Sequence, residues 1–259
     1  MINIEIIDMK VLIAFWLAFS RWSAIVMQMP LFDNSTIPVV LKILTTLLFT
    51  YAFFPMVEAS ILTDINYMGV DSFWSLTAFY TLVGVVLGFF VKAIMSIFLG
   101  AGSVITQQIG FSAIRYFDTT AKAQIGPFEK LISWTVLIMV VKSGALLPMF
   151  KGVVHSFETI HIYDFTRLSG SSAFYVNFFK NMFHSTLLLA SPLIFSNVLI
   201  MAVLGIIAKT IPQMNVLTVS FVVNIGLGLI IFSATSDEFF NIAYRIYVER
   251  LGEWFQFIK

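Results

Sequence analysis

Three polar side chains have a spacing that could hold a metal ion or perform acid–base chemistry. His155, Glu158 and His161 form the pattern H-x-x-E-x-x-H in the longest polar stretch of the chain, residues 151–180. On a helix, a separation of six residues places the two imidazoles about 240° apart, whereas two histidines that share a zinc ion are four residues apart. We therefore interpret these residues as part of a polar surface, and we expect no metal and no other cofactor.

A serine and a histidine could also form a hydrolytic pair. Ser103 follows Gly100-Ala101-Gly102, and His184 lies in a later apolar run. Small residues in an apolar helix more often allow close helix packing, and no pattern of oxyanion donors accompanies Ser103. No pair of aspartates lies deep within an apolar run. We therefore expect that the chain is not an enzyme.

The composition of the chain is that of a membrane protein. The chain has 259 residues, of which 59% are hydrophobic and 11% are charged, whereas a soluble domain carries about 25% charged residues. This composition excludes a soluble enzyme and a disordered linker, and the absence of cysteine excludes a disulfide scaffold. The formal net charge of +1 leaves no basic surplus to neutralise phosphates, which argues against a nucleic-acid partner.

Charged residues divide the sequence into apolar runs, and about 20 apolar residues are enough to cross a bilayer. Such runs cover residues 72–91, 93–114, 181–208 and 210–236. Three further runs each contain one cation, and they cover residues 11–29, 38–57 and 131–150. Continuous apolar runs predict helices and not the alternating strands of a barrel. We therefore predict an all-α fold of long helices and helical hairpins, in one domain that covers residues 1–259.

Polar and proline-containing stretches mark the expected ends of these helices. Pro30 and Pro38 flank a turn, residues 58–71 read as an acidic connector, and residues 110–127 read as a loop. The turn around Pro212 separates two long apolar runs, which predicts an antiparallel hairpin. From about residue 237 to 259, apolar residues recur at helical spacing between charged ones. That pattern predicts an amphipathic helix at an interface or in a groove of a partner.

Four cations lie within or between the apolar runs: Arg21, Lys42, Lys92 and Lys142. A cation at the centre of a membrane span costs about 2.5–3.5 kcal/mol, and no apolar run contains an acid that could pair with them locally. Lys92 separates two runs, so its side chain could extend to the interface. Arg21 and Lys142 lie near the middle of their runs, and for them we expect protein–protein contacts or a water-filled cavity.

Gly84 and Gly88 have the spacing G-x-x-x-G inside an apolar run. Small residues at this spacing let two membrane helices approach closely. Glycine is also frequent in membrane helices generally, so a chance occurrence is the alternative reading. We predict that these glycines are helix-packing positions.

Four stretches in the same order carry a family resemblance. They are Arg21 with Pro30, Pro38 and Lys42; the run Gln107–Ala113 followed by Phe117-Asp118; Ser191-Pro192; and the turn Pro212-Gln213-Met214-Asn215. Together they resemble the R-type subunit family of the bacterial flagellar export gate (FliR) and its injectisome counterpart (SctT, also called SpaR). Two positions depart from the family pattern: Ser143-Gly144 replaces a common Asn-Gly pair, and Asp118-Thr119 replaces a frequent Asp-Pro pair.

The resemblance implies a non-enzymatic subunit of a type III export gate in the bacterial inner membrane, at the flagellar basal body. Such a subunit joins FliP-like and FliQ-like subunits and contacts an FlhB-like switch protein, and unfolded exported proteins pass through the gate. The counter-ions of the four cations would then lie on neighbouring subunits. The injectisome counterpart and a stand-alone multispanning transporter or channel are the alternative functions.

The resemblance also implies that a loop at about residues 106–127 helps to plug the closed channel. Gly110 would give the backbone the freedom for a tight turn, and three apolar side chains would form a constriction. The residues expected in the plug are Gly110, Phe111, Ser112, Ala113, Ile114 and Phe117.

Overall fold

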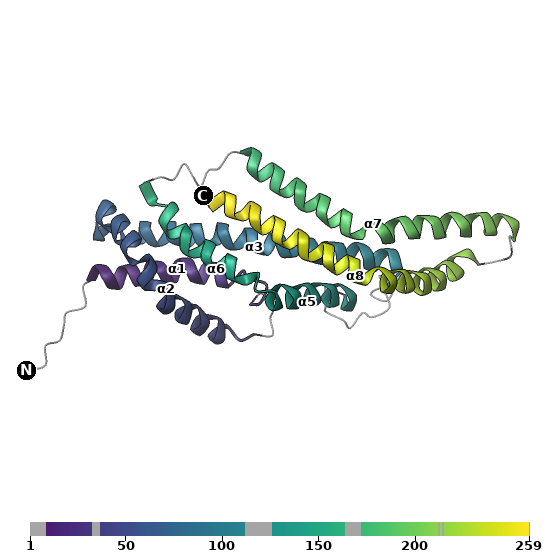
Figure 1. Ribbon diagram of the computed structural model, residues 1–259, viewed down its shortest axis with the longest axis horizontal. Coiled ribbons are helices and arrows are strands. Elements are labelled where there is room, and N and C mark those ends of the chain that lie inside the picture. Colours follow the sequence, from purple (N-terminus) through teal and green to yellow (C-terminus); the bar gives the residue numbers. More distant parts are fainter. Residues whose placement is uncertain are drawn as a thin grey trace, which may run out of the picture. The chain divides into compact units, whose positions relative to one another are not determined.

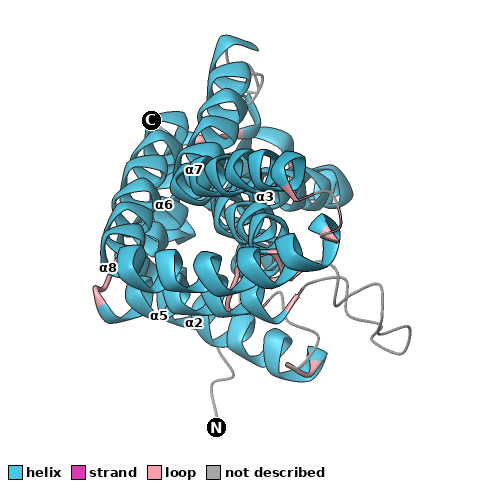
Figure 2. Ribbon diagram, turned by 90° about the vertical axis from the view of Figure 1, so that its right-hand side faces the viewer, coloured by secondary structure: helices cyan, strands magenta, loops and turns pink. Residues whose placement is uncertain are grey.

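The structure is a computed structural model that describes residues 9–32, 37–111, 126–163, 172–211, 213 and 215–258. Every regular element in those ranges is a helix (Figure 2), which confirms the predicted all-α fold. The elements are α1 (Met9–Val26), α2 (Val39–Met68), the short 3₁₀ helix η1 (Val70–Ser72), α3 (Phe73–Ile109), α5 (Pro127–Lys142), α6 (Leu146–Thr159), α7 (Ser172–Thr210) and α8 (Val216–Ile258).

Five of the described helices are long and apolar enough to cross a membrane: α1, α2, α3, α7 and α8. The pair α5 and α6 passes the same test of length and composition only when the two are taken together, and they are bent by 76° at the break between them. The predicted run 131–150 is therefore broken. The break falls at Gly144, whose φ of +72° favours glycine,.

Two of the predicted boundaries are wrong because a polar residue alone does not end a helix. Lys92 lies inside the continuous helix α3, where its side chain is exposed. Lysine is a good helix former, and no proline is nearby to interrupt the backbone hydrogen bonds. The expected connector at residues 58–71 is mostly the last part of α2, which continues to Met68 and ends at Gly69 with a φ of +80°.

The described chain forms two compact units, and each unit draws on segments that are far apart in the sequence. Unit 1 contains α1, α2, the first part of α3, α6, the start of α7 and the end of α8. Unit 2 contains the rest of α3, α5, and most of α7 and α8. The division falls at Ala93 within α3, at Asn177 within α7 and at Glu249 within α8.

In unit 1, α3 meets α1 at two glycines. A Cβ atom on Gly84 would lie 2.5 Å from the backbone oxygen of Arg21, and one on Gly88 would lie 3.1 Å from the Cα atom of Ile25. The absence of a side chain therefore lets the two backbones approach. Next to Arg21 in α1, the Trp22 ring stacks on Phe53 of α2 with the ring centroids 5.3 Å apart.

In unit 2, α7 and α8 lie side by side as a hairpin, and α7 bends along its length (Figure 1). Pro192 lies inside α7 and has no N–H group for the helix,. The Ser191 hydroxyl donates instead to the Leu188 carbonyl at 2.7 Å. Beyond α7, Gln213 lies exposed in the turn and Pro212 lies outside the described residues.

The remaining turn residues lie at helix starts. Asn215 caps α8, since its Oδ1 accepts a hydrogen bond from the Thr218 N–H at 3.3 Å,. Pro38 immediately precedes α2, where its missing N–H costs nothing. Pro30 lies in the turn that follows α1.

The predicted C-terminal amphipathic helix is not a separate element, because it is the last part of α8. The apolar stripe nevertheless has the predicted register. Its members are all buried: Phe239, Ala243, Ile246, Tyr247, Trp254 and Ile258. Within unit 1, Gly152 of α6 provides the space for the end of α8, because a Cβ atom there would lie 2.4 Å from the Trp254 ring.

We expect Gly84→Ala to destabilise the protein by about 1–3 kcal/mol, the usual cost of an extra methyl group in a packed core. The new Cβ would collide with a backbone oxygen, which cannot move aside as a flexible side chain could. Gly205→Ala is the matched control, because nothing lies within 4 Å of a Cβ at that helical position. The thermal unfolding temperature in detergent measures both variants, and equal temperatures would contradict the packing role of Gly84.

Candidate functional site

The carboxyl-terminal end of α3 in unit 2 carries the first residues of the predicted plug. The helix ends at Ile109, and Gly110 follows with a φ of +88°, a conformation that residues with a side chain rarely adopt,. The Gly110 N–H donates to the Gln107 carbonyl at 3.1 Å. The chain therefore turns away from the helix axis at Gly110.

Two other helices hold this end of α3. The last carbonyl groups of a helix have no partner within it, and the Asn197 side chain of α7 donates from Nδ2 to the Gln108 carbonyl at 2.7 Å. Gly228 lets α8 approach from another side, since a Cβ atom there would lie 2.9 Å from the Ile109 side chain. The position at which the chain leaves α3 is thus fixed by a hydrogen bond and a close contact.

An aromatic cluster continues from the same point. The Phe111 ring stacks on Phe128 of α5 with the ring centroids 6.2 Å apart, and Phe128 contacts Phe232 of α8 edge-on at 4.9 Å. Phe232 in turn contacts Phe239 at 5.5 Å. Phe111 is therefore packed against the helices of unit 2. The other expected plug residues lie outside the described residues: Ser112, Ala113, Ile114 and Phe117.

A small polar cavity lies beside the end of α3. It is lined by residues of α3, α7 and α8, among them Gln108, Asn197, Asn224 and Gly228, and its volume is about 10 Å³. This space is enough for about one water molecule. Asn224 is buried, and its Oδ1 has no hydrogen-bond partner among the described residues. Three amide side chains and Ser196 therefore line one small cavity between apolar helices.

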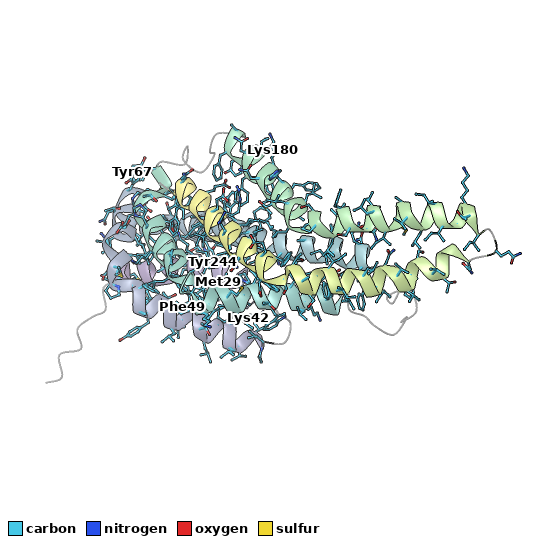
Figure 3. The ribbon with its side chains drawn as sticks, turned by 45° about the vertical axis from the view of Figure 1, so that its right-hand side comes forward. Met29, Lys42, Phe49, Tyr67, Lys180 and Tyr244 are labelled. Carbon is cyan, nitrogen blue, oxygen red and sulfur yellow. The ribbon has the colours of Figure 1, made fainter. Side chains whose placement is uncertain are left out.

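Three of the four predicted cations lie away from the buried core. Lys42 is half-buried on α2, where Figure 3 labels it, and Lys92 is exposed on α3. Lys142 is the last residue of α5 and is exposed. The expectation that Lys142 lies in mid-helix is therefore wrong, and a cation at a helix end is favoured by the helix dipole. Subunit contacts of these three lysines stay a prediction.

Arg21 differs, because its guanidinium is completely buried in unit 1. Nη1 donates to the Ser156 carbonyl at 2.8 Å and Nη2 to the Ile160 carbonyl at 3.4 Å. The guanidinium carbon also lies over the rings of Tyr80, at 4.4 Å, and Phe157, at 4.2 Å. Arg21 is therefore a buried charge with partners inside this chain, and a contact with a neighbouring subunit stays a prediction.

The acid that accompanies Arg21 comes from α2. Asp64 is completely buried, and its Oδ2 accepts a hydrogen bond from the Tyr80 hydroxyl at 2.7 Å. Because Arg21 lies over the same Tyr80 ring, one residue of α3 contacts both the cation and the acid. A buried cation with a nearby buried anion avoids much of the cost of an isolated charge in an apolar core.

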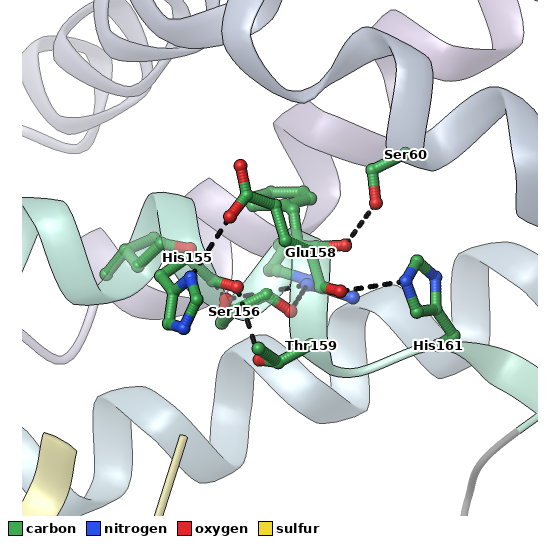
Figure 4. Close-up of polar contacts among 9 residues, drawn as sticks. Ser60, His155, Ser156, Glu158, Thr159 and His161 are labelled. Atoms are coloured by element: carbon green, nitrogen blue, oxygen red, sulfur yellow. Dashed lines mark hydrogen bonds and ion pairs between the residues drawn. The ribbon is translucent and has the colours of Figure 1, made fainter. Parts of the chain in front are cut away.

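The H-x-x-E-x-x-H residues lie at the carboxyl-terminal end of α6, which ends at Thr159 (Figure 4). His155 Nδ1 contacts Glu158 Oε2 at 3.0 Å, whereas His161 lies beyond the helix and contacts Asp64 Oδ1 at 3.1 Å. The angle argument for a helix through both histidines therefore does not apply. The two imidazoles point to different partners, and among the described residues no group of three His, Asp or Glu side chains could hold a metal ion.

The second possible catalytic pair is not assembled. Ser103 lies on α3 and His184 is exposed on α7, and no hydrogen bond joins them in the described part of the chain. Sequence reasoning missed Asp64, although it shares one helix face with Val57 and Ile61, at separations of seven and three residues,. That register was the signal for a buried acid.

Comparison with known proteins identifies relatives over most of the chain. A family model described as bacterial export proteins, family 1, matches residues 12–249. Flagellar biosynthetic protein FliR of Bacillus subtilis is 28% identical over 239 residues, 90% of each chain. The FliR protein of Borreliella burgdorferi is 28% identical over 154 residues, 58% of this chain and 57% of that one. The FliR protein of Escherichia coli is 21% identical over 224 residues, 85% and 84% of the two chains. These findings confirm the family resemblance of the four sequence motifs.

We expect Tyr80→Phe to lower the free energy of unfolding by about 1–3 kcal/mol, because it leaves buried Asp64 Oδ2 without its hydroxyl donor,. The ring and its contact with Arg21 are retained. Tyr67→Phe is the control, since Tyr67 lies on α2 three residues after Asp64 and its side chain is exposed. Thermal unfolding in detergent measures both variants, and a Tyr80→Phe protein as stable as the control would show that the Asp64 contact contributes nothing.

Proposed function

The chain belongs to the bacterial export proteins, family 1, and from this premise we propose that it is a structural, pore-forming subunit of the flagellar type III export gate. In this role it lies in the bacterial inner membrane and conducts unfolded flagellar proteins without enzymatic chemistry of its own. It assembles with FliP-like and FliQ-like subunits and contacts an FlhB-like switch protein. The relatives named above are flagellar proteins, which favours the flagellar branch over the injectisome branch.

The observation that carries the proposal is the length of the exposed apolar face of α7. Large apolar side chains are exposed from Phe179, at 45%, to Ile206, at 69%, and many others project from the hairpin of α7 and α8 (Figure 3). These 27 steps along a helix cover about 40 Å, whereas the hydrocarbon of a bilayer is about 30 Å thick. Lipid alone covers such a face only at a tilt near the upper end of the observed range, whereas neighbouring subunits cover it at any tilt.

The end of α3 supports a gate within this subunit. Gly110 and Phe111 lie where the chain leaves α3. Among the described residues, Asn197 donates to the adjacent Gln108 carbonyl and Phe128 stacks on Phe111. Opening needs only these contacts to break, so the gate has two arrangements separated by a small free energy. The segment that follows Phe111 is proposed as the plug on the family resemblance alone.

Co-assembly tests the proposal directly. We expect the chain to aggregate when it is produced alone and to purify as a defined hetero-oligomer when it is produced with P-type and Q-type subunits. A photoreactive phenylalanine analogue at Phe179, which is exposed, should crosslink to a partner subunit, whereas the same analogue at the adjacent buried Phe178 should not. A stable, monodisperse chain that crosslinks only to lipid would contradict the proposal.

The gate is tested by Gly110→Val. Its positive φ makes a β-branched side chain strained by about 1–3 kcal/mol,, which is enough to shift a two-state gate by roughly 5- to 150-fold. We expect a change in small-ion leak through the assembled gate or in swimming motility.

Gly144→Val is the control for backbone strain away from the end of α3. Gly144 also has a positive φ, +72°, but it lies in the turn between α5 and α6. It should leave the leak unchanged. Normal leak and motility in an assembled Gly110→Val protein would argue against a gating role for the end of α3.

A further inference from the structure

We propose that His161 and Asp64 form a proton-binding latch that holds the end of α6 against α2. The latch is closed only while the pair carries one more proton than a neutral imidazole together with a carboxylate. The proposal concerns unit 1 alone, and it does not depend on the export role.

The two ring nitrogens of His161 both face acceptors. Nδ1 lies 3.1 Å from Asp64 Oδ1. Nε2 lies 3.0 Å from the backbone carbonyl oxygen of Glu158, a contact that Figure 4 draws. A neutral imidazole has one N–H donor and one bare acceptor nitrogen, and a carbonyl or a carboxylate oxygen cannot donate. Both contacts therefore form together only when the ring carries two protons or when Asp64 is itself protonated. In either case, the pair holds the additional proton.

The groups around the pair match a donor at His161 and an acceptor at Asp64. Asp64 Oδ2 accepts a hydrogen bond from the Tyr80 hydroxyl, and the Arg21 cation lies over the Tyr80 ring. On the other side of the ring, Nε2 faces one of the last carbonyl groups of α6. The carboxyl-terminal end of a helix carries partial negative charge and attracts a cation.

The other groups around His161 leave this arrangement in place. The Glu158 carboxylate of α6 contacts His155, not His161, and the Tyr163 ring stacks on the imidazole with the centroids 4.9 Å apart. Tyr67 of α2 contacts Tyr163 in turn. The side chain of His161 is 14% exposed whereas that of Asp64 is 0% exposed, so the imidazole is the group through which the proton exchanges with water.

Loss of the proton removes one of the two hydrogen bonds. The neutral ring can donate to Asp64 or to the Glu158 carbonyl but not to both. Among the described residues, the end of α6 then depends on Arg21, which donates to the Ser156 and Ile160 carbonyls, and on Ser60, which donates to the Phe157 carbonyl. The stabilisation is therefore present at low pH and lost as the pH rises, within the range of about pH 5 to 8 in which imidazole side chains change charge.

The absence of cysteine from the chain makes a clean accessibility experiment possible. Ile160→Cys places a thiol at a buried position between α6 and His161, and Lys151→Cys places a reference thiol at an exposed position on α6. Maleimide labelling of the full chain in membranes is measured at pH 6 and at pH 8. At each pH, the labelling rate of Ile160→Cys is divided by that of Lys151→Cys. This ratio largely removes the ordinary effect of pH on thiol reactivity. We expect the ratio to rise roughly tenfold between the two pH values, the factor for one hydrogen bond of usual strength.

Three variants assign the effect. His161→Gln and Asp64→Asn should each make the ratio independent of pH, because neither retains the pair that binds the proton. His155→Gln should keep the full dependence, since His155 contacts only the exposed side of α6. A constant ratio in the parent chain, or a pH dependence that persists in His161→Gln, would overturn the proposal. If Asp64→Asn does not fold, the partly exposed His161→Gln still decides. A chain that shows the latch but does not assemble with gate subunits would contradict the proposed function alone.

Discussion

A buried cation in an apolar chain must find all of its partners inside the protein, and this constraint organises unit 1. The guanidinium of Arg21 lies over two aromatic rings, and its Nη1 and Nη2 donate to carbonyl groups at the end of α6. Its negative partner, Asp64, is reached through Tyr80 of α3. An unpaired charge at such a position would cost several kcal/mol, so α1, α2, α3 and α6 must converge there. Gly84 allows this convergence because its missing side chain lets α3 approach the backbone of α1.

The same constraint operates on the backbone in unit 2. In apolar surroundings, a carbonyl group without an internal partner is costly, and at two irregularities of the helices a nearby side chain supplies the donor. Ser191 does so where Pro192 interrupts α7, and Asn197 does so where α3 ends. Ser191 and Asn197 therefore lie where one helix is interrupted and another ends, and the second of these places is the end of α3 that carries Gly110.

The sequence predicted the helical class, the buried stripe near the C-terminus and the family, because each depends on local periodicity or on an ordered set of motifs. It did not predict that α3 continues through Lys92, since charge was taken as a boundary although lysine is a good helix former,. Nor did it pair Arg21 with Asp64, 43 positions later in what looked like a connector. That pairing depends on how α1, α2 and α3 meet, which spacing within one segment does not encode. The sequence also did not predict the contact between His161 and Asp64, because this contact depends on α6 ending at Thr159.

The described helices differ in how much of their apolar surface is buried within the chain. The most apolar windows of α1 and α3 are 50% and 61% buried within the chain, whereas those of α2, α7 and α8 are only 11%, 22% and 22% buried. Among the described residues, Arg21 is fully buried and has partners within the chain, while Lys92 and Lys142 are exposed. The fold is thus held by internal charge and backbone pairing, and hydrophobic burial is incomplete until lipid or other subunits cover the outer helices. In the proposed role, neighbouring subunits would supply part of that cover.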